Sequence, residues 1–240
     1  MRIILNGAQG AMGRELQRIL PAAGHEIVAK VDVNGGAYTG MAQVQVPADM
    51  VVDFSFHTAT AGAVDYALAH NLPIVVGTTG HTEQERAHIL LAGEKIPVFY
   101  SGNMSLGIAV LCNLVREAVR IFPQADVEIL EIHHNRKADA PSGTALMLAR
   151  AVQSVRPDAV VHCGRAGVGS RLPREIGVAS LRMGNIVGIH EVLISTGNET
   201  ITLKHEAHDR ALLAQGAAEA AAFLQDKGPG VYGMEELVSK

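Results

Sequence analysis

The sequence predicts an α/β fold with two parts: a doubly wound parallel sheet, then an α+β domain with a mixed sheet. Short apolar runs alternate with helical stretches throughout residues 1–101. A glycine-rich turn follows the first of these runs. After Ser101 the regular alternation ends, and longer helical and strand-like segments replace it. Together these observations favour two domains in a chain of 240 residues.

The first half of the chain reads as a series of βαβ units. Short runs rich in β-branched residues predict strands at residues 2–6, 25–32, 51–56, 73–77 and 97–101. Helical stretches separate most of them, so we expect a parallel sheet with helices on both faces. Residues 33–50 are rich in glycine and predict an irregular loop instead.

The second half has a different pattern. We expect helices at residues 105–122, 142–155 and 209–225, and strands at 126–134, 177–182, 186–196 and 199–206. A Gly-Asn turn joins the last two strands as a hairpin. Residues 162–176 are rich in Gly and Arg and poor in apolar residues, and a short tail follows the last helix.

Composition excludes several classes of protein. The net charge is −4, aromatic residues make up 4% and Trp is absent, so the stacking surfaces of a nucleic-acid binder are lacking. No apolar run approaches the ~18 residues that span a membrane, and nothing resembles a signal peptide. Cys112 and Cys163 lie far apart, which argues against a disulfide framework or a zinc site. We expect a cytoplasmic enzyme without a metal.

A glycine-rich turn separates the first predicted strand from the first helix. Its glycines are spaced GxxGxxG, whereas GxGxxG is commoner. They allow the backbone to approach a pyrophosphate, which then rests on N–H groups at the helix N-terminus. An ordinary βα turn would explain the glycines alone, but their position after the first strand favours a Rossmann-like dinucleotide site. The residues expected to bind here are Gly7, Ala8, Gln9, Gly10, Ala11, Met12 and Gly13.

Asp32 ends the second predicted strand, where an acid can accept hydrogen bonds from the adenosine ribose. The alternative is a simple strand-end residue. A carboxylate there favours the free 2′-hydroxyl of NADH, and Val33 cannot clamp the 2′-phosphate of NADPH. Lys30 and Tyr38 are close enough in sequence to approach that phosphate. We therefore expect NADH, NADPH or both to bind, with a modest preference for NADH.

Two further turns follow predicted strands at the edge where a nicotinamide would lie. Both are small and polar, and ordinary turn chemistry would also explain them. The expected cofactor-binding residues are Gly77, Thr78 and Thr79 in the first turn, and Ser101, Gly102, Asn103 and Met104 in the second.

The segment EIHHNRKADAPSGTA, residues 131–145, concentrates polar groups between a predicted strand and a helix. His133 and His134 face opposite sides of a strand, so the pair alone does not chelate zinc. Lys137 offers a point charge, and the helix that opens at Pro141–Thr144 offers N–H groups and a dipole to an anion. Simple helix capping explains only the Pro-Ser-Gly. A proton donor beside a carboxylate site is the more economical interpretation.

This segment resembles the signature of the 4-hydroxy-tetrahydrodipicolinate (dihydrodipicolinate) reductases, E-x-H-H-x-x-K-x-D-A-P-S-G-T-A. GAQGAMG, GTTG and SGNMSLG are similar to the family's dinucleotide loop, nicotinamide-side turn and hinge, with Met104 where the family often has Phe. The region 164–192 is similar to its C-terminal sheet, although Ile189 replaces the usual Glu. The resemblance covers nearly the whole chain.

The resemblance implies an NAD(P)H-dependent reductase of lysine and diaminopimelate synthesis, acting on a cyclic dicarboxylate. Residues 1–104 and 209–240 would form the dinucleotide-binding domain, and 105–208 the substrate-binding and tetramerisation domain of a homotetramer. His133 would protonate the ring after hydride transfer, and Lys137 would assist and bind a carboxylate. The other implied substrate-binding residues are His134, Ser142, Gly143 and Thr144.

Two alternatives remain at this stage. Another two-domain dehydrogenase would share the glycine turn but has no need for HHxxKxDAPSGT. A non-catalytic NAD-sensing protein would not need His133 and Lys137. His190, His205 and His208 are interpreted as structural or near-site polar residues rather than metal ligands.

Overall fold

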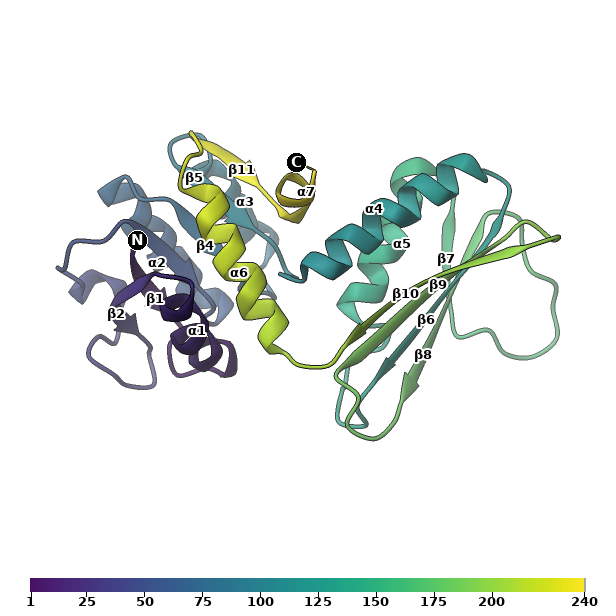
Figure 1. The fold of residues 1–240 in the computed structure, drawn as a ribbon, viewed down its shortest axis with the longest axis horizontal. Helices are drawn as coiled ribbons and strands as arrows, with labels where there is room; N and C mark the ends of the chain where they lie inside the picture. Colours follow the sequence, from purple (N-terminus) through teal and green to yellow (C-terminus); the bar gives the residue numbers. More distant parts are fainter. Residues whose placement is uncertain (240) are drawn as a thin grey trace. The chain divides into compact units, whose positions relative to one another are not determined.

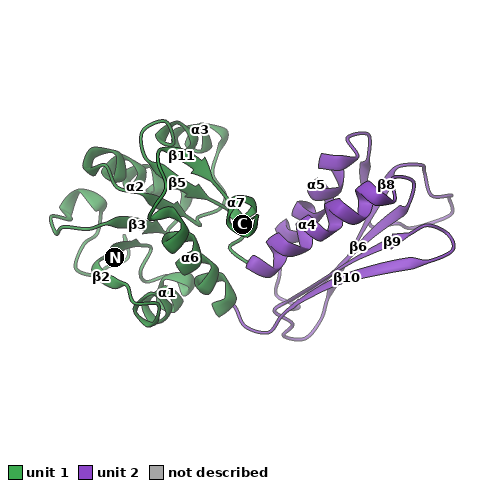
Figure 2. Ribbon diagram, turned by 45° about the horizontal axis from the view of Figure 1, so that its top comes forward, with its two compact units in different colours: residues 1–105, 211–240 green, residues 106–210 purple. Residues whose placement is uncertain are grey.

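The computed structural model describes residues 1–239, which form two compact units (Figures 1 and 2). Unit 1 contains residues 1–105 and the segment from Ala211 onward, and unit 2 contains Leu106–Arg210. The chain therefore leaves unit 1 after Ser105 and returns to it at Ala211.

Unit 1 is built on a six-stranded sheet in the order β11-β5-β4-β3-β1-β2, and every strand pair in it is parallel. The strands are β1 (Arg2–Asn6), β2 (Glu26–Val31), β3 (Met50–Asp53), β4 (Ile74–Val76), β5 (Pro97–Tyr100) and β11 (Gly230–Tyr232). All residues of β3 and β4 are buried, as expected of central strands covered on both faces.

Helices cover the sheet of unit 1 in two layers. Its helices are α1 (Ala11–Ala22), η1 (Met41–Gln43), α2 (His57–His70), α3 (Glu83–Ala92), α6 (Ala211–Leu224) and α7 (Met234–Val238). α1 packs against α6, while α2 packs against α3. The strand order runs in opposite directions from β1, so right-handed crossovers place α1 on one face and α2 and α3 on the other, and α6 lies with α1. The predicted doubly wound sheet is confirmed.

Unit 2 has a mixed five-stranded sheet in the order β10-β9-β6-β8-β7. Its elements are α4 (Leu106–Ile121), β6 (Asp126–His133), α5 (Gly143–Val155), β7 (Val160–Cys163), β8 (Glu175–Arg182), β9 (Gly188–Ser195) and β10 (Thr200–Ala207). β6 pairs with β8 in parallel and with β9 antiparallel, and it alternates between buried and half-buried positions. The buried side packs against α4 and α5 in one core.

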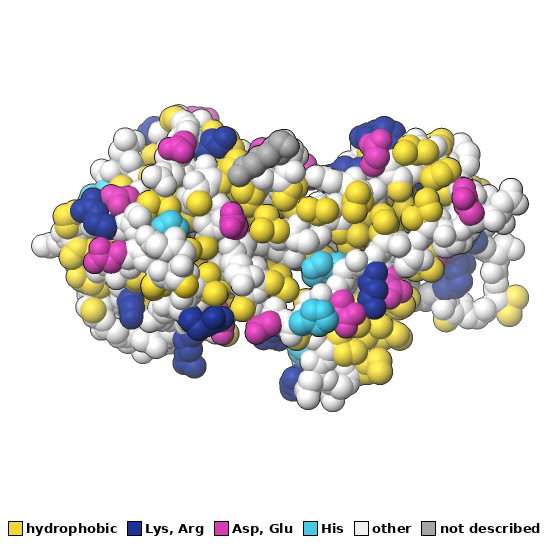
Figure 3. Space-filling model, in the orientation of Figure 1, with side chains coloured by type: hydrophobic (Ala, Val, Ile, Leu, Met, Phe, Trp, Pro, Cys, Tyr) yellow, Lys and Arg dark blue, Asp and Glu magenta, His cyan; other side chains and the backbone are white. Residues whose placement is uncertain are grey.

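Apolar side chains also remain on the outer surfaces of unit 2. Half-buried Leu130 and Ile132 of β6 lie on the sheet face opposite the helices, beside Ile189 and Leu193 of β9. Hydrophobic side chains also lie over the outward side of α4, where Leu114 is 50% exposed (Figure 3).

Three details differ from the sequence-based expectations. β3 ends at Asp53 rather than at Phe56, since the chain turns there to begin α2. β7 was not expected because it is an exposed edge strand without alternating burial. β11 lies in what was expected to be a tail; it has only three residues and is held by pairing with β5, which no local pattern encodes.

The carboxyl group of Asp53 joins the ends of several elements in unit 1. It is completely buried and accepts hydrogen bonds from Asn6 Nδ2 (2.8 Å) and Ser55 Oγ (2.5 Å) on one oxygen. Thr60 Oγ1 (2.7 Å) and Thr78 Oγ1 (2.9 Å) donate to the other. The donors come from the ends of β1 and β4, from the turn after β3 and from α2. Asp53 therefore fixes the carboxyl edge of the sheet.

Replacement of this carboxyl group is the first testable prediction. Asp53→Ala should lower the free energy of unfolding by about 3 kcal/mol, because it leaves several buried donors without their acceptor. Urea denaturation of the full chain measures the loss. Asp49→Ala is the matched control, since Asp49 pairs with Arg2 at the surface and its removal should have a much smaller effect. Equal losses in both variants would contradict the role given to Asp53.

Candidate functional site

The glycine turn of unit 1 requires glycine at two positions. Gly7 has a φ of 85°, and a Cβ there would lie 2.3 Å from the carbonyl oxygen of Phe54. A Cβ on Gly13 would lie 2.1 Å from the carbonyl oxygen of Gly7. Gly10 is the N-cap of α1, and no side chain caps this helix end. The turn thus presents backbone N–H groups at a helix N-terminus, the arrangement that binds phosphates in dinucleotide sites.

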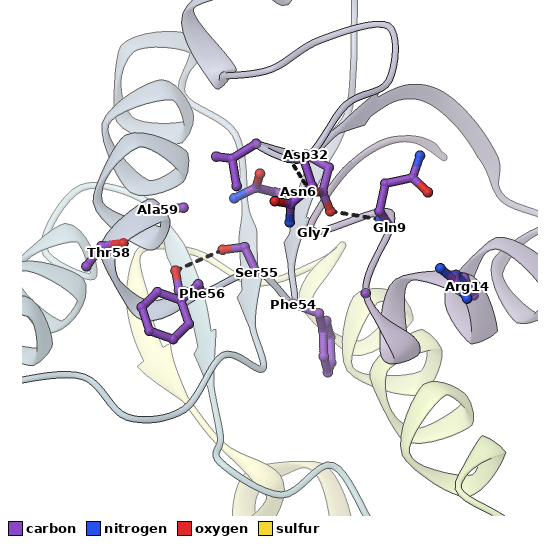
Figure 4. Close-up of a pocket in the computed structure, with 13 residues that line it drawn as sticks. Asn6, Gly7, Gln9, Arg14, Asp32, Phe54, Ser55, Phe56, Thr58 and Ala59 are labelled. Carbon is purple, nitrogen blue, oxygen red and sulfur yellow. Dashed lines mark hydrogen bonds between the residues drawn. The ribbon is translucent and has the colours of Figure 1, made fainter.

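Asp32 directly follows β2 and contacts this turn. Its Oδ2 accepts a hydrogen bond from the backbone N–H of Gln9 (2.8 Å), and its Oδ1 accepts one from that of Asn34 (2.9 Å). Figure 4 shows the bond between Asp32 and Gln9 at the rim of a cavity. The buried carboxylate therefore holds two loops together and still lines the cavity.

This cavity has a volume of about 720 Å³. The glycine turn lines one side, and the segment that follows β3 lines the other (Figure 4). Sequence reasoning missed most of the other lining residues, among them Arg14 on α1, Ser55, and Phe56, which is 65% exposed. The run FSF at the carboxyl end of the predicted strand 51–56 was a signal for the latter two, since ligands bind at the carboxyl ends of parallel strands.

Ala8, Ala11, Met12 and Gly13 belong to the same turn but do not line the cavity, and the residues expected at the nicotinamide end lie at the ends of β4 and β5. Thr78 is buried and donates to Asp53, whereas Thr79 is exposed. Ser101 Oγ donates to the carbonyl oxygen of Asn103 (2.8 Å), forming a tight turn, and Met104 is buried. The structure therefore gathers Gly7, Gln9, Gly10 and Asp32 around one cavity, and it leaves these two turns outside its lining.

A second polar cluster lies in unit 2, at the carboxyl end of β6. Glu131 and His133 both point to the helix-covered side of the sheet, as residues two apart on a strand do. His133 Nδ1 lies 2.5 Å from Glu131 Oε2, and Arg182 of β8 donates to both oxygens of Glu131 at 2.9 and 2.8 Å. Burial alone would raise the pKa of Glu131, but bonds from Arg182, Ser180 and His133 outweigh it and lower the pKa to about 2.

The N-terminus of α5 meets this cluster. Ser142 is the N-cap: its Oγ accepts from the backbone N–H of Ala145, and its own N–H donates to Glu131 Oε1 (3.1 Å). Ser142 Oγ also lies 3.1 Å from His190 Nε2. Burial, and then the neighbouring His133, lower the pKa of His190 to about 4, so His190 is a neutral partner at neutral pH. A Cβ on Gly143 would meet no atom within 4 Å, so open space adjoins this helix end.

His134 and Lys137 lie at the exposed side of the same segment. His134 Nε2 is 3.2 Å from Arg210 Nη2, and partial burial followed by the charges of Arg136 and Arg210 lowers the pKa of His134. Lys137 Nζ donates to Asp139 Oδ1 at 2.8 Å. Unit 2 thus gathers all the substrate residues expected from the sequence in one segment and at the helix end that follows it.

Three residues of this cluster were missing from the predicted site: Glu131, Arg182 and His190. Glu131 could have been found, because a Glu two positions before a His on a strand shares its face. His190 was interpreted only as a structural or near-site polar residue, and Arg182 could not have been found, since the register of the sheet alone brings it next to β6.

No helix among residues 1–239 is both long and apolar enough to cross a bilayer. Within the same residues, no group of three His, Cys, Asp or Glu side chains is arranged to hold a metal ion.

Comparison with known proteins relates the whole chain to one family. The family model described as dihydrodipicolinate reductase, N-terminus, matches residues 1–104, and the model for the C-terminus matches residues 107–238. The 4-hydroxy-tetrahydrodipicolinate reductase of Caldanaerobacter subterraneus subsp. tengcongensis is 42% identical over 248 residues, which cover 100% of this chain and 99% of that protein. The enzyme of that name from Akkermansia muciniphila is 39% identical, with 98% and 97% covered.

A solved structure supports the fold. The dipicolinate-bound dihydrodipicolinate reductase from Paenisporosarcina sp. superimposes with a TM-score of 0.84 over 99% of both chains, at 23% identity. The two family models together span nearly all of the sequence, and the relatives match it from end to end. The chain therefore belongs to the dihydrodipicolinate reductase family, as its motifs predicted.

Proposed function

We propose that this chain reduces 4-hydroxy-tetrahydrodipicolinate to tetrahydrodipicolinate with NADH or NADPH, a step of diaminopimelate and lysine synthesis. In this reaction one hydride and one proton enter the substrate and one water leaves. Family membership and the names of relatives such as the Caldanaerobacter enzyme support the assignment. When bound, the reduced nicotinamide supplies the hydride.

The observation that carries the proposal is the cluster around His133. The imidazole is held at Nδ1 by Glu131, and its other nitrogen lies beside Gly188 and the ring of His190. Hydride addition to a conjugated imine leaves an electron pair that needs a proton, and His133 Nε2 would supply one. A positioned acid of this kind accelerates such a step by about 10²–10⁴-fold.

The N-terminus of α5 and Lys137 would bind the carboxylates of the substrate. The first N–H groups of a helix point outward along its axis, and this end of α5 carries Gly143 and Thr144 next to open space. The dipole of a 13-residue helix favours an anion there. Lys137 adds a positive charge near His190 and His134, whose pKa values it helps to lower. The solved relative that contains dipicolinate supports a dicarboxylate ligand.

The cofactor would bind to unit 1. The turn from Gly7 to Gly13 would bind a pyrophosphate with the N–H groups at the start of α1, and its glycines let the backbone pack tightly enough to form this turn. Asp32 would accept a ribose hydroxyl with the lone pairs that Gln9 and Asn34 leave available. We propose that the turns at Gly77–Thr79 and Ser101–Met104 bind the nicotinamide end of the cofactor. They follow β4 and β5, which neighbour each other in the sheet.

We also propose a cytoplasmic homotetramer joined through the sheets of unit 2. The outer face of that sheet supports this: Leu130, Ile132, Ile189 and Leu193 lie in one strip, between Glu128 and Glu191, that a second copy of the chain would cover. The exposed free thiol of Cys163 suits a reducing compartment.

We expect Leu193→Lys to shift the purified chain to smaller species in light scattering, since it places a charge in this strip. An unchanged mass would contradict the assigned face.

The reductase proposal predicts the behaviour of two variants. His133→Gln should lower kcat for 4-hydroxy-tetrahydrodipicolinate by about 10²-fold or more and leave cofactor affinity nearly unchanged. Lys137→Ala should lower kcat and also raise KM for the substrate, since the same cation would assist proton transfer and bind a substrate carboxylate. NADH oxidation with and without substrate measures both, and it separates a reductase from an NAD-sensing protein. His162→Gln, at an exposed position on β7, is the control. Wild-type turnover in His133→Gln would remove this residue from the mechanism.

Cofactor preference is the next prediction. Asp32 disfavours the 2′-phosphate of NADPH, but Arg14 lines the same cavity and offers it a positive charge. We expect a preference for NADH of about tenfold or less, near 1.4 kcal/mol. The two values of kcat/KM at equal ionic strength measure it, and Asp32→Ser should move the ratio toward NADPH. A strong preference of the wild type for NADPH would show that Asp32 does not face the ribose.

A further inference from the structure

Glu131 is a fully buried carboxylate whose oxygens are both saturated by donors. Oε1 accepts from Arg182 Nη2 (2.8 Å) and from the backbone N–H of Ser142 (3.1 Å). Oε2 accepts from Arg182 Nη1 (2.9 Å) and lies 2.5 Å from His133 Nδ1. The side chain of Glu131 has no exposed surface, and its low pKa, near 2, keeps it ionised at neutral pH.

The protonation of the neighbouring imidazole follows from this carboxylate. An ionised carboxylate only accepts hydrogen bonds, so the nitrogen that faces it must carry a proton. His133 is therefore the Nδ1–H tautomer, or doubly protonated, but never the Nε2–H tautomer alone. The atom that gains and loses a proton is Nε2, on the far side of the ring.

Two groups of β9 lie against the Nε2 side of the ring. Gly188 of β9 passes beside it, and a Cβ at that position would lie only 3.1 Å from Nε2. The ring of His190 packs edge-on at 5.1 Å between centroids. The His133 side chain is 10% exposed, so the ring is held in place but is not sealed off.

Arg182 in turn fixes the carboxylate. Its guanidinium forms a bidentate pair with Glu131, and Nη2 also donates to the carbonyl oxygen of Asp139 (2.6 Å). Nη1 donates to the carbonyl oxygen of Leu181 (2.7 Å). A planar fork held at four acceptors restricts the carboxylate to one orientation, which a lysine could not do.

We infer that Glu131 and Arg182 are positioning residues for proton transfer: Arg182 orients Glu131, and Glu131 fixes the tautomer and the ring orientation of His133. This inference rests on the proposed function for the identity of the acceptor. In the step, the Nε2–H bond of His133 breaks and its electron pair stays on Nε2. The proton bonds to the substrate ring through the electron pair left by hydride addition. Glu131 remains ionised, Nδ1 keeps its proton, and a solvent proton restores Nε2.

Nuclear magnetic resonance of the free protein tests the tautomer without any substrate. In the full chain labelled with ¹⁵N-histidine, we expect a far-downfield N–H proton attached to Nδ1, assigned to His133 by its loss in His133→Gln. The resonance should disappear or move strongly upfield in Glu131→Gln. It should persist in Glu175→Gln, which removes another buried carboxylate that pairs with an arginine, Arg165. A His133 protonated on Nε2 alone would overturn the inference.

Kinetics of the same variants test the effect on the proposed reaction. Glu131→Gln should lower kcat by about 10²–10⁴-fold with little change in KM for the cofactor, as loss of the orienting carboxylate does in comparable acid–base sites. Arg182→Lys should lower kcat less than Glu131→Gln does, and it should retain the fold. This variant therefore tests the inference even if Glu131→Gln does not fold. Wild-type kcat in both variants would overturn the inference. The expected resonance in a wild type without reductase activity would instead refute the proposed function and leave the Glu131–His133 pair in place.

Discussion

Each unit of this protein is organised around one buried carboxyl group near the carboxyl end of a central strand. A buried carboxyl group must be satisfied by donors, so the segments that supply the donors are fixed relative to one another. Asp53 draws donors from four places in unit 1, and Glu131 draws donors from β6, β8 and the N-cap of α5 in unit 2. The geometry of the cavity in unit 1 depends on Asp53, and that of the His133 cluster in unit 2 depends on Glu131.

The two carboxyl groups differ in their donors. This difference matches the roles proposed for the glycine turn of unit 1 and for the His133 cluster of unit 2. Asp53 accepts from the Asn6 amide, a backbone N–H and hydroxyl groups, and these neutral donors hold a backbone turn in a fixed shape. Glu131 accepts from a guanidinium and an imidazole, which pair a fixed charge with a titratable ring. The first arrangement suits the recognition of a phosphate by N–H groups, and the second suits the movement of a proton.

Sequence reasoning reached the family, the fold class and most elements, because these follow from periodicity and from one long motif. It found the segment around His133, whose residues are close in sequence. It did not find Arg182, which is 51 positions from Glu131 and is placed by the parallel pairing of β6 with β8. The short strands β7 and β11 were missed for the same reason, since pairing with a neighbour, rather than local composition, holds them.

The return of the chain to unit 1 has a consequence for the order in which the protein folds during synthesis. Unit 2 is one continuous segment, so all its strands are available once residue 210 has left the ribosome. Unit 1 must wait for α6, which packs against α1, and for β11, which completes the edge next to β5. The apolar surface that α6 covers beside α1 therefore stays exposed while the ribosome makes unit 2. Nascent chains in this state would depend most on chaperones.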